Sequence, residues 1–178
     1  MNFELSDEQS IIVNTTRHFL EKEIYPHEKM VEKTGEVPRE LGAEIAKKCK
    51  EIGFFAANFP EELGGGGMNH LEFTLLEREL GRGSNALTIF FGRPSGILMA
   101  CNDLQKDKYL IPAIKGEKFD ALAMTEPGAG SDVRGMECTG QRKGGDWIVN
   151  GTKHFISHAD IADFVIVFIA TGEEETEK

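Results

Sequence analysis

The chain has 178 residues, of which 40% are hydrophobic and 28% charged, an ordinary composition for a globular protein. Its formal net charge of −10 argues against a nucleic-acid partner, because a phosphate backbone requires a basic surface. No apolar run approaches the length needed to cross a bilayer, so we also expect no membrane partner. The length allows one domain, or one domain and part of another.

Three widely spaced cysteines, Cys49, Cys101 and Cys138, form neither a CxxC pair nor a disulfide framework. Free thiols of this kind are typical of a reducing compartment, so we expect a cytoplasmic protein. The first residues show neither a secretory signal nor an Arg-rich transit peptide. The five histidines have no metal-ligand spacing with one another or with cysteine, so we expect no metal.

The first two thirds of the chain show helical patterns. Ser6 and Gln9 form a capping box ahead of an apolar stripe, and we expect that helix to fray near Tyr25-Pro26. Pro38 lies where a second helix begins, and Gly53 is a natural stop for it.

Three more helical segments follow. One carries Leu71 to Leu80 and ends at Gly81. The apolar stretch 86–100 is interrupted at 92–94, where a proline predicts a break or a kink. A further helix is expected over 103–114.

After about residue 120 the pattern changes to short β-rich segments separated by Gly or Asp turns. The expected strands are 121–125, 136–142, 147–150, 153–156 and 164–170, with a hairpin loop at 144–146. The last strand is almost continuously apolar and needs cover on both faces. Helices first and strands second predict a segregated α+β fold, with an all-α domain over 1–120 and an incomplete β domain over 121–178.

The segment Thr125 to Asp132, which reads TEPGAGSD, is the most informative part of the chain. It follows an apolar strand and turns sharply at Pro127, which fixes its own φ. Gly128 and Gly130 permit positive φ and remove the side chains that would hold a ligand away. Backbone N–H groups and hydroxyls in such a turn suit a diphosphate or the edge of a flavin.

A second motif, Asn150 to Ser157 (NGTKHFIS), stands downstream at a spacing that makes the pair specific. Together with Leu5 to Gln9, Pro60 to Gly65 and Gly116 to Lys118, these segments resemble the acyl-CoA dehydrogenase flavoprotein family. The resemblance covers essentially the whole chain.

That resemblance implies a helical N-terminal domain followed by a β-barrel-like middle domain. Family members also have further strands and a C-terminal helical bundle, which these 178 residues do not contain. We therefore expect an incomplete chain, although a truncated product or a natural half-protein completed by a second chain would show the same pattern.

The family reaction is the FAD-dependent α,β-dehydrogenation of an acyl-CoA thioester. A carboxylate removes the α-proton while the β-hydrogen passes as hydride to the flavin. The resemblance implies FAD as cofactor, an acyl-CoA substrate, an electron-transfer flavoprotein as acceptor and a homo-oligomer, usually a tetramer. The catalytic glutamate of the family lies in the C-terminal bundle, so no catalytic residue is assigned in this chain.

By the same resemblance, Met124 and Thr125 lie at the flavin ring. Gly130 and Ser131 face the FAD diphosphate and the pantetheine arm, so Ser131 is also a candidate substrate contact. For each of these residues the alternative is a purely local role, such as a strand end or a turn cap.

Phe155 and Ser157 are expected to lie along the flavin. The family often has Trp and Thr at these two positions, so the aromatic area is smaller and the hydroxyl is less restrained here. Glu126 is a carboxylate beside the proposed site and would be the first choice of base from the residues alone. The resemblance argues against it, because the signature glutamate is not the base in the family.

The stretch 86–100 corresponds to the acyl pocket of the family. Its candidate lining residues are Thr88, Phe91, Ile97 and Leu98, although plain helix packing is an equal alternative. Arg93 either reaches a polar acyl group or extends to solvent.

Two other functions remain open at this point. One is a non-catalytic flavin- or CoA-binding subunit that needs a partner chain, which a C-terminal bundle in the same reading frame would exclude. The other is a flavin oxidase or monooxygenase of the same superfamily, which would turn over with oxygen alone.

Overall fold

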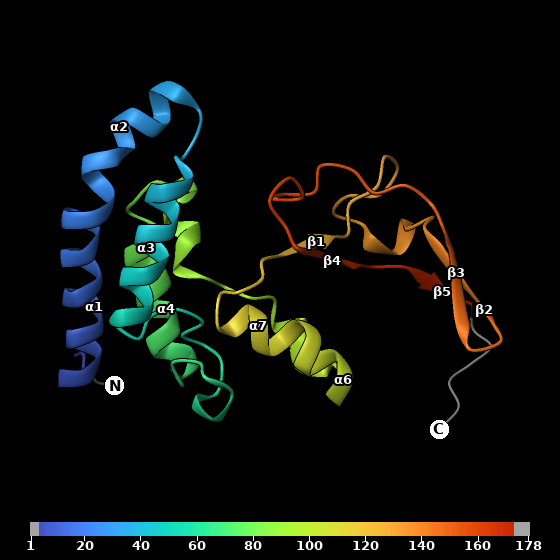
Figure 1. The fold of residues 1–178 in the computed structure, drawn as a ribbon, viewed down its shortest axis with the longest axis horizontal. Helices are drawn as coiled ribbons and strands as arrows, with labels where there is room; N and C mark the ends of the chain where they lie inside the picture. Colours follow the sequence, from blue (N-terminus) through green and yellow to red (C-terminus); the bar gives the residue numbers. More distant parts are fainter. Residues whose placement is uncertain (1–3, 173–178) are drawn as a thin grey trace. The chain divides into compact units, whose positions relative to one another are not determined.

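A computed structural model of the chain describes residues 4–172. Contacts divide the chain into two compact units, Met1–Glu117 and Lys118–Lys178. Among the described residues, the first unit is helical and the strands lie in the second (Figure 1). The segregated α+β fold predicted from the sequence is confirmed.

The helical unit contains α1 (Asp7–Phe19), α2 (Tyr25–Thr34), α3 (Arg39–Glu51), α4 (His70–Leu80), α5 (Asn85–Thr88), α6 (Asp103–Gln105) and α7 (Ile111–Ile114). The predicted break in the stretch 86–100 is confirmed, because α5 ends before it and a separate 3₁₀ turn, Gly96–Ala100, follows it. None of the helices in the described part of the chain combines the length and apolarity that a membrane crossing needs.

The predicted capping box opens α1. The Gln9 N–H donates to Ser6 Oγ over 3.2 Å, and the Ser6 N–H donates to Gln9 Oε1 over 3.1 Å. Asn69 and Glu72 form the same reciprocal pair at the start of α4. Each box satisfies backbone donors that a helix start leaves unpaired.

The expected fraying at Tyr25-Pro26 is wrong. The helix passes from α1 to α2 through a π-helical turn, Leu20–Ile24, in which the Tyr25 N–H donates to the Leu20 carbonyl five residues back. A second π turn, Lys106–Leu110, precedes Pro112 in the same way. A proline lacks an N–H and clashes with the carbonyl four residues back. The extra residue of a π turn therefore lets the chain remain helical across each proline.

The helical core joins α1 to α4 through apolar side chains. The rings of Phe19 and Phe91 meet edge to face with centroids 4.9 Å apart. Around them lie the buried side chains Leu20, Ile24, Val31, Ile45, Cys49, Phe54, Ala57, Leu76, Leu80 and Leu87. Burying one such large side chain contributes about 1.5–3 kcal/mol, so this core stabilises the unit strongly.

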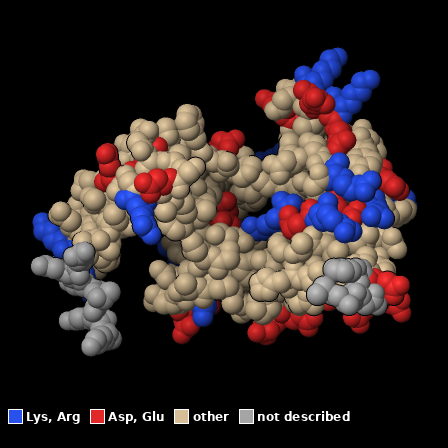
Figure 2. All heavy atoms as spheres, turned by 180° about the vertical axis from the view of Figure 1, so that it is seen from behind, with Lys and Arg blue, Asp and Glu red and all other residues tan. Residues whose placement is uncertain are grey.

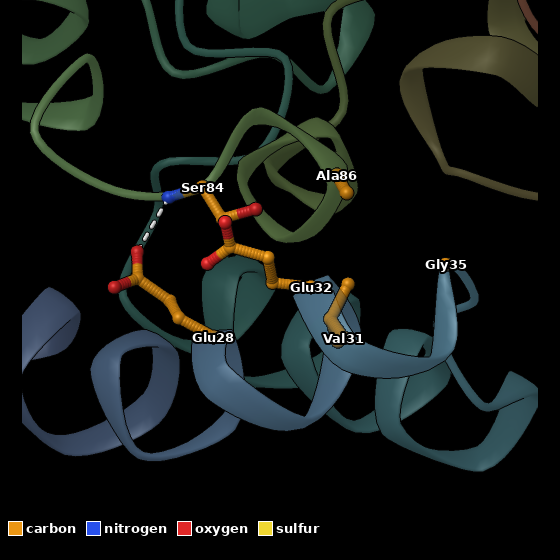
Figure 3. Close-up of a pocket in the computed structure, with 6 residues that line it drawn as sticks. All are labelled: Glu28, Val31, Glu32, Gly35, Ser84 and Ala86. Carbon is orange, nitrogen blue, oxygen red and sulfur yellow. Dashed lines mark hydrogen bonds between the residues drawn. The ribbon is translucent and has the colours of Figure 1, made fainter.

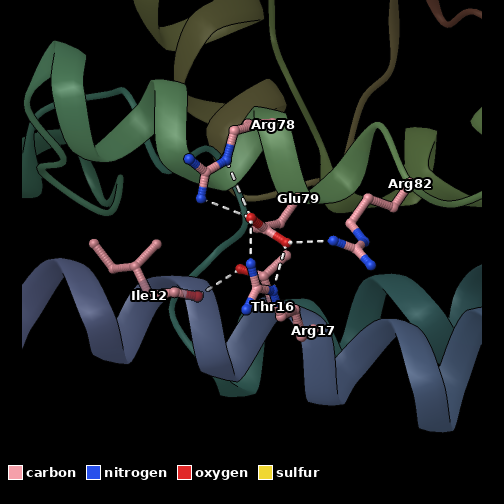
Figure 4. A network of polar contacts seen from close by, with 6 residues as sticks. All are labelled: Ile12, Thr16, Arg17, Arg78, Glu79 and Arg82. Carbon is pink, nitrogen blue, oxygen red and sulfur yellow. Dashed lines mark hydrogen bonds and ion pairs between the residues drawn. The ribbon is translucent and has the colours of Figure 1, made fainter. Parts of the chain in front are cut away.

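A buried carboxylate lies between α1 and α4. The side chain of Glu79 is 2% exposed, and it accepts hydrogen bonds from Arg17 (2.7 Å) and Arg78 (2.8 Å), with Arg82 at 3.7 Å (Figure 4). The hydrogen bond from Arg17 holds the pKa of Glu79 below its ordinary value, against the opposing effect of burial. Neighbouring charges of opposite sign are also common over the face shown in Figure 2.

The β unit contains β1 (Asp120–Ala123), β2 (Thr139–Lys143), β3 (Asp146–Asn150), β4 (Phe164–Val167) and β5 (Ala170–Thr171). Strands β1 and β4 pair in parallel, and a second sheet has the order β3-β2-β5. The predicted hairpin joins β2 and β3. The expected single strand over 164–170 divides into β4 and β5, one in each sheet.

The two sheets are small and do not close a barrel within the described residues. Large apolar side chains remain uncovered on them. Leu122, Val165 and Val167 are 41–48% exposed, and Trp147 on β3 is 50% exposed. Apolar strands of this kind are normally covered on both faces.

Replacing Glu79 by Gln should lower the free energy of unfolding at neutral pH by about 1–3 kcal/mol, since charge-assisted hydrogen bonds are lost at a buried site. Because the pKa of Glu79 is lowered in the folded protein, its stabilisation is present above the unfolded pKa and is lost as pH falls through the folded pKa. The difference between wild type and Glu79→Gln, measured by urea unfolding, should therefore shrink in acid.

Glu77→Gln is the matched control. Its partner Arg93 lies 2.5 Å away, but both side chains are about one third exposed, so the expected loss is below about 1 kcal/mol. Equal losses for the two variants would contradict the role given to Glu79.

Candidate functional site

The TEPGAGSD loop begins where β1 ends, in the β unit. The Glu126 N–H donates to the Ala129 carbonyl over 2.9 Å and so closes a tight turn over Pro127 and Gly128. Asp132 then accepts from the Arg134 N–H over 3.1 Å and begins a 3₁₀ turn, as expected for a turn residue. The loop is therefore a defined structure.

The carboxylate of Glu126 is the centre of this loop. It accepts hydrogen bonds from the Lys153 ammonium (2.7 Å), the Cys138 N–H (2.9 Å) and the Glu137 N–H (2.6 Å). The side chains of Glu126 and Lys153 are only 3% and 9% exposed. Lys153 also donates to the Met124 carbonyl over 2.9 Å, so one ammonium contacts two points of the loop.

This environment makes Glu126 unsuitable as a general base. The hydrogen bond from Lys153 lowers the pKa of Glu126, and the two backbone N–H groups act in the same direction, while burial opposes them. A base needs an accessible carboxylate whose pKa lies near the working pH. The sequence-based choice against Glu126 agrees with this geometry.

Thr125 and Phe155, two of the predicted flavin contacts, are brought together by the backbone. The His154 N–H donates to the Thr125 carbonyl over 3.0 Å, and Phe155 is the next residue. Met124 and Thr125 are half-buried, whereas Gly130, Ser131 and Ser157 are exposed.

Phe155 itself is in an unusual state. Its φ is +54°, a conformation that a bulky residue seldom adopts, and its side chain is 86% exposed. Its ring stacks on that of His154 with centroids 4.1 Å apart. The strand expected over 153–156 is therefore wrong, because a residue with this φ cannot lie in a β ladder. A strained, exposed aromatic side chain is a typical feature of a binding site.

The glycines of the loop do not use the positive φ that they permit. Neither Gly128 nor Gly130 has a positive φ. A Cβ added at either position would meet no atom within 4 Å. Neither the backbone nor internal packing requires glycine at these two positions. The open space above them suits close approach of an external group.

A pocket of about 410 Å³ lies beside the loop, within the β unit. Its lining residues are Glu126, Pro127, Gly128, Glu137, Thr139, Asn150, Gly151 and Thr152. Both sequence motifs contribute residues to it, but none of the six predicted flavin contacts is among its lining residues.

The helical unit has a separate pocket of about 470 Å³. Glu28 and Glu32 extend into it, and Glu28 accepts a hydrogen bond from the Ser84 N–H (Figure 3). The lining residues of this pocket include no cation, so its two carboxylates would repel the phosphates of a nucleotide cofactor. The pocket beside the loop also has two carboxylates, but that of Glu126 is paired with Lys153. Despite its size, the pocket of the helical unit is therefore not the candidate site for such a ligand.

The candidate acyl-pocket residues divide into two groups. Phe91 is part of the helical core, and Thr88 and Leu98 are buried, whereas Ile97 is 45% exposed. Arg93 donates to Glu77, so its guanidinium has a partner in its own unit.

Within the described residues, no group of three or more His, Cys, Asp or Glu side chains could hold a metal ion.

Sequence comparison agrees with these features. The model of the acyl-CoA dehydrogenase N-terminal domain matches residues 6–117, and that of the acyl-CoA dehydrogenase middle domain matches residues 121–178. The fold and the loop thus define a flavoprotein-type dehydrogenase architecture. The chain belongs to the acyl-CoA dehydrogenase family.

Individual relatives share this similarity. The chain is 39% identical to the 3-(aryl)acrylate reductase of Clostridium sporogenes, covering 93% of this chain and 44% of that protein. It is 36% identical to the benzylmalonyl-CoA dehydrogenase of Aromatoleum aromaticum, covering 98% and 47%. A glutaryl-CoA dehydrogenase of Mycobacterium smegmatis, solved in complex with FADH2, superposes with a TM-score of 0.81 at 26% identity, covering 94% and 43%. The chain thus spans about half the length of the relatives it matches.

Gly130→Ala should leave the free energy of unfolding unchanged to within about 1 kcal/mol, because its φ suits alanine and the added methyl meets open space. Gly151→Ala is the contrasting variant, since its φ is +146° and a Cβ would lie 2.5 Å from Cys138 Cα. We expect a loss of about 2 kcal/mol or more there, measured by urea unfolding. A large loss for Gly130→Ala would mean that the fold itself requires that glycine.

Proposed function

We propose that this chain is the N-terminal portion of an enzyme that catalyses FAD-dependent α,β-dehydrogenation of an acyl-CoA thioester. The proposal rests on the loop of residues 124–132 and on the exposed ring of Phe155. Neither backbone conformation nor packing requires glycine at Gly128 or Gly130 of this loop, and the space beside them is open. Family membership and the relative solved with FADH2 support the same cofactor. We also propose 1–120 and 121–178 as the two domains.

The residues present fit FAD. An added Cβ at Gly130 would occupy open space, as expected where a diphosphate approaches a backbone. Gly130 and Ser131 would hold the diphosphate, and Ser131 would also contact the pantetheine arm. The Thr125 hydroxyl would bond to the flavin ring.

The remaining contacts are assigned in the same way. Met124, Phe155 and Ser157 would line the ring, and the exposed face of Phe155 offers apolar area for it. Bound FAD would supply the electron acceptor for the β-hydrogen of the substrate. The chain's own residues bind and orient, and in this proposal the α-proton is removed by a carboxylate outside residues 4–172, since Glu126 is committed to Lys153.

The proposal includes two further elements that rest on the family resemblance: an electron-transfer flavoprotein is the electron acceptor, and the whole protein is a homo-oligomer. Its proposed location, the cytoplasm, rests on the widely spaced free cysteines. The names of the relatives add a substrate class to examine, because one acts on an arylacrylate and another on benzylmalonyl-CoA.

The test uses the protein expressed from its complete reading frame. We expect a yellow protein that releases FAD on denaturation and oxidises saturated acyl-CoAs with an electron-transfer flavoprotein as acceptor. Aliphatic, dicarboxylic and aryl-substituted thioesters should be assayed in both directions. Turnover with oxygen alone would instead indicate an oxidase, and a colourless protein that binds no added FAD would overturn the proposal.

Gly130→Val should weaken FAD binding at least tenfold, or about 1.4 kcal/mol, because the side chain would occupy the space proposed for the diphosphate. The affinity of the apoprotein for FAD is measured by quenching of flavin fluorescence. Gly145→Val is the matched control, since Gly145 also has open space and no positive φ but lies in the β2–β3 hairpin. Unchanged affinity in Gly130→Val would argue against a diphosphate at this position.

A further inference from the structure

We propose that the buried ion pair of Glu126 and Lys153 is the positioning element of the flavin site. It would fix Thr125 and Phe155 relative to each other, without contacting substrate itself. This inference rests on the proposed function and assigns to these two residues a role in cofactor binding beyond fold stability.

Hydrogen bonds connect the ion pair to the proposed flavin contacts. The Glu126 carboxylate joins residues 137 and 138 to Lys153, and Lys153 returns to the Met124 carbonyl. The His154 N–H completes the link through the Thr125 carbonyl. Met124 and Thr125 therefore belong to this hydrogen-bonded network, and Phe155 directly follows His154, another member. Of the four proposed ring contacts, Ser157 is the exception.

The backbone of Phe155 is strained. Its φ is +54° and it is 86% exposed, with its ring stacked on the neighbouring His154, so little packing from elsewhere in the unit holds it in that state. Such conformations persist only when the surrounding structure enforces them. Lys153, two residues earlier, is anchored at both Met124 and Glu126. That anchor is what sets the chain direction leading into Phe155.

The pair is better suited to specifying a geometry than to adding stability. A buried ion pair is weak evidence for stability, because an apolar pair of similar volume often stabilises as well. Its directional hydrogen bonds, however, specify one geometry. A site that must hold a cofactor edge against two separate segments needs such geometry, since small displacements weaken binding and catalysis.

The test is Lys153→Met in the complete protein. It removes the donor to Met124 and Glu126 while keeping much of the side-chain volume. We expect FAD affinity to fall at least tenfold and the visible absorption bands of the remaining bound flavin to shift. Lys153→Arg, which retains charge and donors, should restore part of the affinity. Wild-type affinity and an unshifted spectrum in Lys153→Met would overturn the inference.

The control is Lys48→Met in the helical unit. Lys48, 34% exposed, forms ion pairs of 2.6 Å with Glu23 and 2.8 Å with Glu44, so the same substitution removes an ion-pairing lysine outside the β unit. FAD affinity and the flavin spectrum should remain those of the wild type. An equal loss of FAD in this variant would mean that general destabilisation explains the effect.

Lys153→Met leaves Glu126 buried without its partner, so that variant could fail to fold. The double variant Glu126→Gln with Lys153→Met removes both charges and avoids this outcome. If circular dichroism shows that the double variant folds but its FAD affinity is low, the positioning role of the pair is supported. Wild-type FAD affinity in the double variant would overturn that role. A wild-type protein that binds no FAD would be a different result, because the proposed function itself would then fail.

Discussion

The buried ion pair of Glu126 and Lys153 joins three segments of the β unit: residues 124–126, residues 137–138 and Lys153. The sheets have two and three strands and leave Leu122, Val165 and Val167 exposed, so polar contacts contribute much of the loop's order. Glu126 has three donors and Lys153 two acceptors, which satisfies both charges inside the protein. Removing either partner alone would leave a buried charge uncompensated, a far larger penalty than the loss of a surface pair. The order of the loop therefore depends on both residues being present.

The helical unit uses the same chemistry for a different purpose. Glu79 is as buried as Glu126, but the guanidiniums of Arg17, Arg78 and Arg82 are about half exposed. If the carboxylate were lost, those cations could be solvated where they are. Lys153, at 9% exposed, could not. The cluster around Glu79 thus joins two helices whose core is already apolar, whereas the Glu126–Lys153 pair determines local geometry.

The order of the helices and strands could be predicted because it depends on patterns of neighbouring residues. The capping box at Ser6, the break near Pro94 and the hairpin at 144–146 all depend on residues close together in the chain. The helical course across Pro26 was not predicted, since an α-helix rule does not anticipate a π turn that accommodates a proline. The division of the last strand was not predicted either, because its halves pair with two different strands.

The sequence motifs indicated the candidate site residues, but they did not predict the contacts that bring these residues together. The two motifs indicated Met124, Thr125, Gly130, Ser131, Phe155 and Ser157, whose roles stay predictions. The pairing of Glu126 with Lys153 was missed, although both lie within the quoted motifs, because residues 27 positions apart give no local sign of contact. The positive φ of Phe155 was missed for a related reason: β-rich composition predicts a strand, and only the anchored Lys153 and His154 override it.

The uncovered strands bear on how the site would be completed. Leu122, Val165 and Val167 leave apolar surface exposed on β1 and β4, and β1 leads directly into the loop. A flavin held only by this loop and the ring of Phe155 would be open to water on much of its surface, and enclosure is what gives a cofactor site its affinity and its low dielectric. Apolar cover over β1 and β4 from a segment or chain outside residues 4–172 would therefore bury these strands. The same cover would bring further protein close to the loop. Folding of the β unit and closure of the flavin site are therefore expected to be coupled.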